Sequence, residues 1–216
     1  DLYDLPMELK YLPIIESALN PVAVSRQGAT GLWQFMLGTG KIYGLKNNSL
    51  IDERRDPIKS TWAAARYLKD LNAIYQDWNL VLAAYNCGPG TINKAIRRAG
   101  GATDYWTIYN YLPKETRGYV PAFIAANYIM TYYCEHDICP METQLPSATD
   151  TIHIHKDLHL QQVAEVCNLN IDQLRSLNPQ YKKDIVPGNS ELCVLRLPNN
   201  TVSSFIDRQD SICLLY

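Results

Sequence analysis

One carboxylic acid, Glu16, lies in a segment that otherwise carries almost no charge. It follows Leu12-Pro13-Ile14-Ile15, and the helix predicted here must end close to Asn20-Pro21. A carboxyl group in an apolar wall keeps its proton to higher pH, because desolvation disfavours the charged form, and a general acid at neutral pH needs this property. Glu16 is therefore a candidate general acid. The alternative is a glutamate on the exposed stripe of an amphipathic helix.

Two further segments place side-chain amides next to glycines. Residues 28–36, GATGLWQFM, bring Gln34 near a predicted helix start, and an amide that donates and accepts suits sugar hydroxyl and acetamido groups. Residues 83–90, AAYNCGPG, predict a helix that ends in Tyr85 and Asn86 before a glycine turn. The simpler explanations are a loop that leads into a core helix and a helix end at which Asn86 is the capping residue.

A fourth segment, ETRGYVP over residues 115–121, places Tyr119 at the start of an apolar helix, where its hydroxyl could point into a cleft. A core tyrosine with a backbone partner is the alternative. The chain has 15 Tyr and 4 Trp but only 3 Phe, so most of its aromatic rings carry a polar group. This bias suits carbohydrate contacts, although tyrosines of cores and interfaces explain it equally well.

The elements that must position these residues are helices, since helical periodicity dominates residues 1–137 and no convincing alternating strand occurs there. Asp56-Pro57 predict the start of a helix that extends to Tyr75. Its apolar residues recur every third position, and they are expected to form one face: Trp62, Ala65, Leu68, Leu71 and Ile74. The other helices are predicted over residues 79–85, 91–99 and 119–133, the last of them buried with Pro121 in its first turn.

Residues 140–150, PMETQLPSATD, have the composition of a linker between a mainly α domain over residues 1–139 and a second domain over residues 151–198. The second domain is predicted to be a small βααβ module. The tail, residues 199–216, could pack on either domain. The predicted strands are residues 151–155 and 191–197, and the predicted helices are residues 158–167 and 171–177.

The four chemical segments follow one another in the order Glu-Ser, Gly-Leu-x-Gln, Ala-Tyr-Asn and Tyr-Val. This order resembles the catalytic domain of lytic murein transglycosylases, which is related to goose-type lysozymes. The resemblance covers residues 5–137, and LPMEL at 5–9 and DERRDPIKSTWAAARYL at 52–68 are similar to the membrane-bound D type of that family. It implies a mainly α, lysozyme-like α+β catalytic domain.

The resemblance implies a lyase that cleaves the MurNAc–GlcNAc β-1,4 bond of peptidoglycan without water and leaves 1,6-anhydro-MurNAc ends. Glu16 matches the family's single catalytic acid/base, and an intramolecular nucleophile removes the need for a second carboxylate. The acids at 52, 53 and 56 are therefore expected to be solvated or ion-paired at a helix entry. The substrate-binding residues that the resemblance implies are Ser17, Gln34, Tyr85, Asn86 and Tyr119. A hydrolytic muramidase of the same fold and a non-catalytic peptidoglycan-binding protein are the alternatives.

Residues 151–198 resemble a LysM module, which binds N-acetylated glycans, and Asn178-Pro179 and Ile185-Val186-Pro187-Gly188 fit its second half. The Gly-Asp-Thr-Leu turn that is usual in such modules is replaced by Lys156-Asp157-Leu158-His159. The glycan-contact loop is thus altered, and packing against the first domain is an alternative role.

His153 and His155 would share one face of a strand, which is an acceptable spacing for metal ligands. No cysteine or acid completes such a set, so neither a metal nor another cofactor is expected. The six cysteines do not reveal their pairing by spacing. Cys134–Cys139 and Cys167–Cys193 are the pairs we would expect if the compartment is oxidising, and free cysteines are the alternative.

The chain has 216 residues, of which 47% are hydrophobic and 19% charged, and this composition excludes wholesale disorder. Its net charge of −2 disfavours a nucleic-acid partner, and no apolar run reaches the length of a membrane helix. Because the chain begins at Asp1 without Met, we expect a mature or trimmed chain, with any membrane anchor outside it. The expected partner is the glycan strand of peptidoglycan. We expect a monomer in the periplasm or cell envelope of a bacterium, with outer-membrane association left open.

Overall fold

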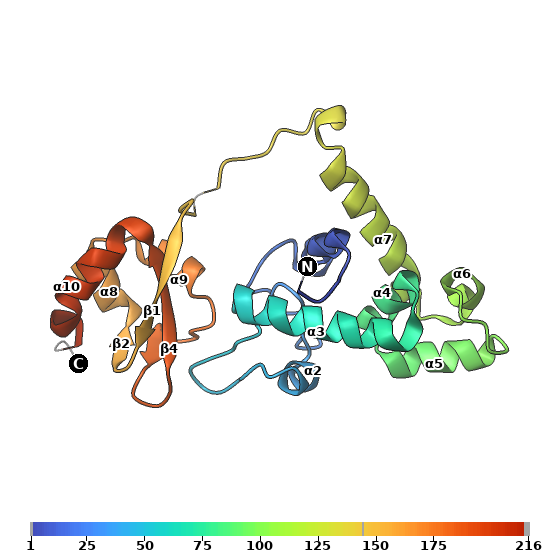
Figure 1. Ribbon diagram of the computed structural model, residues 1–216, viewed down its shortest axis with the longest axis horizontal. Coiled ribbons are helices and arrows are strands. Elements are labelled where there is room, and N and C mark those ends of the chain that lie inside the picture. Colours follow the sequence, from blue (N-terminus) through green and yellow to red (C-terminus); the bar gives the residue numbers. More distant parts are fainter. Residues whose placement is uncertain (1, 144, 214–216) are drawn as a thin grey trace.

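The computed structural model describes residues 2–143 and 145–213. Figure 1 shows two bodies that lie side by side, one helical and one built from strands and helices. An extended segment after α7 (Lys114–Thr131) arches from one body to the other. Within the described residues, no helix combines the length and the apolar character needed to cross a membrane.

The first body is helical, as predicted. Its core is formed where α4 (Trp78–Cys87) packs against α3 (Pro57–Tyr75) and α7. The remaining elements of this body are η1 (Met7–Tyr11), α1 (Leu12–Ser17), α2 (Leu37–Ile42), α5 (Pro89–Arg98), α6 (Tyr105–Ile108), η2 (Tyr109–Tyr111) and η3 (Cys134–His136).

Helix α3 has the predicted bounds, because the Asp56 carboxylate caps it by accepting hydrogen bonds from the first free N–H groups and Pro57 occupies the first turn. The predicted apolar face is wrong at both ends, since Trp62 is 47% exposed and Ile74 is 60% exposed. A spacing of three residues drifts around an α-helix, which has about 3.6 residues per turn. The buried side of α3 is instead formed by Ser60, Ala63, Ala64, Leu68 and Leu71.

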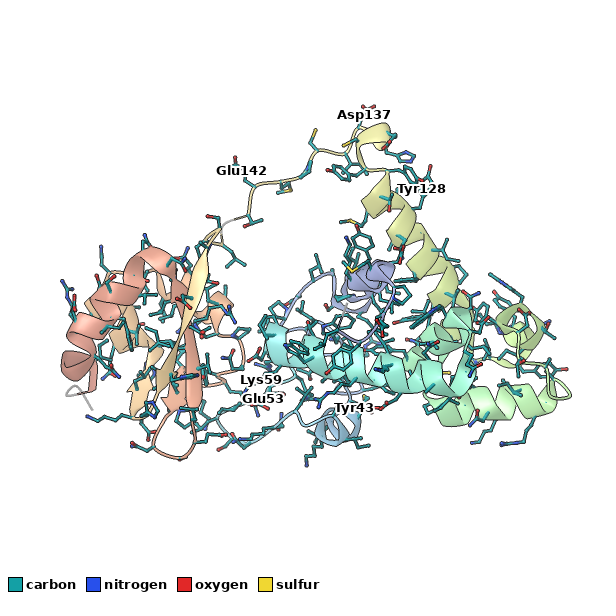
Figure 2. The ribbon with its side chains drawn as sticks, viewed as in Figure 1. Tyr43, Glu53, Lys59, Tyr128, Asp137 and Glu142 are labelled. Atoms are coloured by element: carbon teal, nitrogen blue, oxygen red, sulfur yellow. The ribbon has the colours of Figure 1, made fainter. Side chains whose placement is uncertain are left out.

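Two other predictions require correction. The glycine turn expected at residues 88–90 is a single junction residue, Gly88 with φ +83°, because Pro89 already begins α5. Helix α7 begins five residues before the predicted start at Tyr119, so Pro121 lies inside it. Only its first half is buried against α1 and α4; the second half extends away from the body and leaves side chains such as Tyr128 exposed (Figure 2).

The second body contains the predicted pair of strands and two helices, and adds a second short strand pair. β1 (Thr149–Ile154) pairs antiparallel with β4 (Cys193–Pro198), and β2 (Asp157–His159) pairs antiparallel with β3 (Ile185–Pro187). Helices α8 (Leu160–Cys167) and α9 (Ile171–Leu177) lie between the inner strands in sequence. The tail forms η4 (Asn199–Thr201) and α10 (Val202–Cys213), which packs on α8 and buries Phe205 in the second core.

The expected disulfides are not formed: Cys134, Cys139, Cys167 and Cys193 are all free. Cys134 and Cys139 are exposed on either side of a tight turn. Cys167 and Cys193 are both buried in the core of the second body. The thiol of Cys193 faces the Tyr181 hydroxyl, and Cys167 lies on the helix that packs against α10. Burial raises the pKa of both thiols.

The charged cluster that precedes α3 is ion-paired, as predicted, but it is also buried. The Arg54 guanidinium donates to both carboxylate oxygens of Asp52, and the Glu53 carboxylate pairs with Lys59. Arg54 also donates to the carbonyl oxygens of Gly28 and Phe35, at 3.0 and 3.1 Å. One buried arginine thus holds two points, Gly28 and Phe35, of the loop that connects α1 to α2.

This loop passes so close to Arg54 that residue 31 must be glycine. Gly31 has φ +90°, and a Cβ atom there would lie 1.8 Å from the Arg54 carbonyl oxygen. We expect Gly31→Ala to lower the free energy of unfolding by about 2–5 kcal/mol, through left-handed strain together with the clash. Gly28→Ala is the matched control, because Gly28 has φ +84° but open space around its Cβ position, and it should cost only about 1–2 kcal/mol. Urea unfolding compares the two, and equal losses would contradict the clash.

Candidate active site

The first body contains a cavity of about 770 Å³, within the range typical of small-ligand sites. Its walls come from the end of α1, the loop between α1 and α2, the end of α4 and the start of α7. Five of the six residues that the sequence predicts for the site line this cavity: Glu16, Gln34, Tyr85, Asn86 and Tyr119.

Glu16 occupies the last turn of α1, which ends because Ala18 adopts a left-handed conformation with φ +50°. Burial raises the pKa of Glu16 from its ordinary 4.5 to about 7. A hydrogen bond from Tyr119 opposes this shift, and the nearby charge of Glu115 adds to it. The carboxyl group is therefore poised to both give and take a proton close to neutral pH.

Two tyrosines lie beside Glu16, Tyr119 buried and Tyr85 partly buried. The Tyr119 hydroxyl donates to Oε1 of Glu16, and the Tyr85 hydroxyl donates to the Trp33 carbonyl oxygen at 2.8 Å. Burial, together with the charge of Glu16, raises the pKa of both phenols well above the ordinary value. Both hydroxyls thus stay protonated and act as donors, and Tyr119 orients the carboxyl group.

The two amides of the site present opposite chemistry to the cavity. The Gln34 amide nitrogen donates to the carbonyl oxygens of Gly31 and Ala23, at 2.9 and 3.3 Å, so its oxygen is left to accept. The Thr116 hydroxyl donates to the Asn86 amide oxygen at 2.8 Å, so the amide nitrogen of Asn86 is left to donate. An acetamido group, which has one N–H and one carbonyl, needs one partner of each kind.

Ser17 does not line the cavity, although sequence reasoning placed it among the substrate-binding residues. Its hydroxyl lies 3.0 Å from the Leu32 carbonyl oxygen and 3.2 Å from that of Pro13. The contact with Leu32 ties the helix of Glu16 to the loop of Gln34. Ser17 therefore positions two walls of the cavity relative to each other.

Sequence reasoning missed several residues that line the cavity. Glu115 and Thr116 lie in the same segment as Tyr119, and that proximity was the only available signal. Among the described residues, Arg26 is the one cation in the lining. Tyr67 forms part of the floor, where its ring packs against Tyr85 with centroids 5.3 Å apart. An α3 residue that reaches an α4 residue in this way leaves no local signature in the sequence.

The histidines of the second body are distant in sequence from the residues that line the cavity. His159 caps α8, with its Nδ1 accepting from the Gln161 N–H in a capping box that Gln162 completes. His153 and His155 are exposed on and just after β1. The absence of a metal remains a prediction.

Two family descriptions match the chain. Residues 3–108 match the Transglycosylase SLT domain, and residues 148–213 match the LysM-like domain of lytic transglycosylase MltD. The chain is 36% identical over 183 residues to membrane-bound lytic murein transglycosylase D of Escherichia coli (strain K12), covering 83% of this chain and 40% of that relative. It is 32% identical to the soluble lytic murein transglycosylase of the same organism, over 55% of this chain and 19% of that relative.

A likeness to solved structures agrees with these matches. The crystal structure of the 70 kDa soluble lytic transglycosylase from Escherichia coli has a TM-score of 0.51 and 28% sequence identity. The likeness covers 61% of this chain and 22% of that one. A complex of the 70 kDa soluble lytic transglycosylase with bulgecin A matches with the same TM-score and 27% identity. The mainly α, lysozyme-like fold predicted from the sequence is confirmed.

Proposed function

We infer that the chain belongs to the SLT-domain lytic transglycosylases, since it combines an SLT domain with an MltD-type LysM-like domain. On this premise we propose that it is a peptidoglycan lyase. The proposed reaction cleaves the β-1,4 bond between MurNAc and GlcNAc and leaves 1,6-anhydro-MurNAc ends. The observation that carries the proposal is the carboxyl group of Glu16, whose burial raises its pKa to about 7 in a cavity lined by amides and phenols.

In the first step, protonated Glu16 donates its proton to the oxygen of the glycosidic bond. The bond between that oxygen and C1 of MurNAc breaks, the GlcNAc residue leaves as an alcohol, and positive charge develops at C1. The raised pKa keeps a large fraction of Glu16 protonated near pH 7. Glu16 can therefore act as the acid without a second carboxyl group that supplies the proton.

In the second step, the Glu16 carboxylate takes the proton of the C6 hydroxyl of the same MurNAc, and O6 bonds to C1. The proton count balances, because the carboxyl group begins and ends protonated. The nucleophile belongs to the substrate, so its translational entropy is already lost on binding. Tyr119 supports this step, since its hydrogen bond holds the carboxylate in place between the two transfers.

Gln34 and Asn86 are proposed to hold an acetamido group of the glycan. The free oxygen of Gln34 accepts from the acetamido N–H, and the free N–H of Asn86 donates to its carbonyl. Thr116 makes this possible, because its hydroxyl fixes which way the Asn86 amide points. Peptidoglycan carries such a group on every sugar, so the pair suits this substrate class.

Product analysis tests the proposal directly. Purified peptidoglycan is digested with the full chain, and the soluble products are identified by mass spectrometry. Release of 1,6-anhydro-MurNAc ends supports the lyase, whereas reducing MurNAc ends would replace it with a hydrolase. If no product is released, the chain would be a glycan-binding protein.

The hydrolase is a second candidate because Glu115 lines the same cavity as Glu16. A pair of carboxylates can activate water, one acting as acid and the other as base. In that reaction Glu115→Gln would abolish cleavage. In the lyase, Glu115 does not touch the transferred protons, and the variant keeps its activity with a changed pH dependence.

The two neighbours of Glu16 are expected to move the pH profile in opposite directions. Tyr119→Phe removes a hydrogen bond that lowers the pKa of Glu16, so the loss of rate at alkaline pH should shift to higher pH. Glu115→Gln removes a negative charge that raises this pKa, so the same loss should shift to lower pH. Initial rates from pH 5 to 9 for the two variants and the wild type measure both shifts. Shifts in the same direction would mean that the loss of rate at alkaline pH does not report the titration of Glu16.

We further propose that the chain acts in the bacterial cell envelope, because its substrate is found there. The glycan strand is its partner in this proposal. A monomeric state remains a prediction, as do attachment to the outer membrane and glycan binding by the second body.

A further inference from the structure

The second body is attached to the first by more than the linker, since the two share main-chain hydrogen bonds. The Asp52 N–H donates to the Gln180 carbonyl oxygen at 2.9 Å, and the Lys182 N–H donates to the Leu50 carbonyl oxygen at 2.8 Å. Between them, Ile51 and Tyr181 form an antiparallel bridge. Residues 46–56 of the first body, which we call the docking loop, thus pair with the second body as one short strand pairs with another.

An apolar anchor accompanies these bonds. Ile51 is only 4% exposed, and its side chain belongs to the core of the second body rather than to that of the first. Two charged contacts surround the anchor: Lys46 pairs with Glu191, and the Lys182 ammonium group donates to the Asn48 carbonyl oxygen. Figure 2 shows Glu53 and Lys59, which pair with each other, on the side of the first body that faces the second.

The docking loop is also the support of the cavity. Asp52, whose N–H bonds the second body, holds the Arg54 guanidinium through its carboxylate. Arg54 in turn holds the carbonyl groups of Gly28 and Phe35, which belong to the loop that lines the cavity with Gln34. Two side chains, those of Asp52 and Arg54, therefore connect the interface to the cavity wall.

The cavity loop contains left-handed backbone that the surrounding structure must hold in place. Gly28 and Gly31 have φ of +84° and +90°, and Gln34 has φ +47°, a conformation that costs energy for a residue with a side chain. Internal hydrogen bonds, such as the pair between Thr30 and Phe35, hold the loop, and Tyr85 and Ser17 donate to its carbonyl oxygens from outside. Such segments open locally unless the surrounding structure holds them.

We propose that the LysM-like body acts as a brace for the active-site cavity: by docking on residues 46–56 through Ile51, it holds Arg54 and so keeps Gln34 in its binding position. Ile51 and Arg54 are positioning residues in this proposal, since neither touches the cavity's ligand. The consequence for catalysis rests on the proposed function, whereas the mechanical coupling does not.

Amide hydrogen exchange of the full chain tests the coupling without any assay of activity. Ile51→Ser is expected to accelerate exchange about tenfold at the Asp52 and Lys182 amides, which report the contact between the docking loop and the second body. The same acceleration is expected at the Thr30, Gly31 and Phe35 amides, which report the cavity loop. Ile58→Ser is the matched control, because Ile58 is half exposed on α3. It should leave both groups of amides unchanged.

Arg54→Lys tests the contact between Arg54 and the cavity loop separately from the contact between the docking loop and the second body. Lysine keeps the charge beside Asp52 but lacks the fork that reaches two carbonyl groups. We expect faster exchange at Thr30, Gly31 and Phe35 and unchanged exchange at Asp52 and Lys182. If serine at position 51 prevents folding, Ile51→Ala repeats the test with a smaller loss of apolar contact.

The proposal is overturned if the Ile51 variant loosens the dock and leaves the cavity loop as protected as before. In activity assays, Ile51→Ser should raise KM about fivefold or more with little change in kcat, because Glu16 lies on α1 and not on the braced loop. If the wild type cleaves no peptidoglycan, the proposed function fails. The exchange experiment still decides whether the brace exists.

Discussion

Replacing Glu16 by glutamine is expected to lower the rate of muropeptide release by about 10²–10⁴-fold, the range that a positioned acid or base contributes. Glutamine has the shape of the protonated carboxyl group and can still accept from Tyr119, so the cavity keeps its form. It cannot transfer a proton in either step. Binding of glycan fragments should therefore be retained while cleavage is lost, and the effect should appear in kcat rather than in KM.

Glu8→Gln is the matched control for this loss, because Glu8 is an exposed glutamate on the short helix η1 that directly precedes α1. Both variants are compared with the wild type by quantifying soluble products released from purified peptidoglycan. A Glu16 variant that cleaves at the wild-type rate would remove Glu16 from the mechanism. Equal losses in both variants would point to a general disturbance of the N-terminal helices.

The same substitution is expected to stabilise the protein at alkaline pH. Glu16 has a pKa of about 7 when folded and an ordinary value of 4.5, so the folded state binds its proton more tightly than the unfolded state. This gives the wild type stability that is fully present below pH 4.5 and is lost as the pH rises through 7. Glutamine carries no such proton, so the advantage of the variant should grow by about 2–3 kcal/mol from pH 5 to pH 8.

Urea unfolding followed by tryptophan fluorescence measures this difference in the first body, which contains Glu16. All four tryptophans, at positions 33, 62, 78 and 106, lie in the first body. Glu8→Gln again serves as the control, because Glu8 is exposed and lies outside the cavity. A gain for Glu16→Gln that is the same at pH 5 and pH 8 would mean that burial does not raise the pKa of Glu16.

Sequence reasoning succeeded where the signal is local. The cap formed by Asp56 and the proline that follows it place the start of α3, and both residues are adjacent in the chain. The apolar surroundings of Glu16 are equally local, since most of α1 is apolar. The order of four short motifs then identified which helices share a cavity, and five of the six proposed residues line it.

The sequence could not reveal the direction in which the polar groups point. The orientation of Asn86 depends on Thr116, 30 residues away, and the hydroxyl of Ser17 is taken by a carbonyl group 15 residues away. A side chain that finds a partner within the protein is no longer free for a ligand, and such partners are set by tertiary packing. This is why the sequence did not indicate that Thr116 lines the cavity and Ser17 does not.

The position of Ile51 also has a consequence for the order in which the chain folds. Its bridge partner, Tyr181, lies 130 residues further along the chain (181 − 51). At about 5–20 residues per second, a ribosome needs roughly 10 s to add that stretch. During this interval the helices before residue 137 can already pack, while Ile51 is an apolar side chain with no core to enter. The nascent protein thus passes through a stage in which its first body is formed while the Ile51 side chain is still exposed, until the last third of the chain supplies its core.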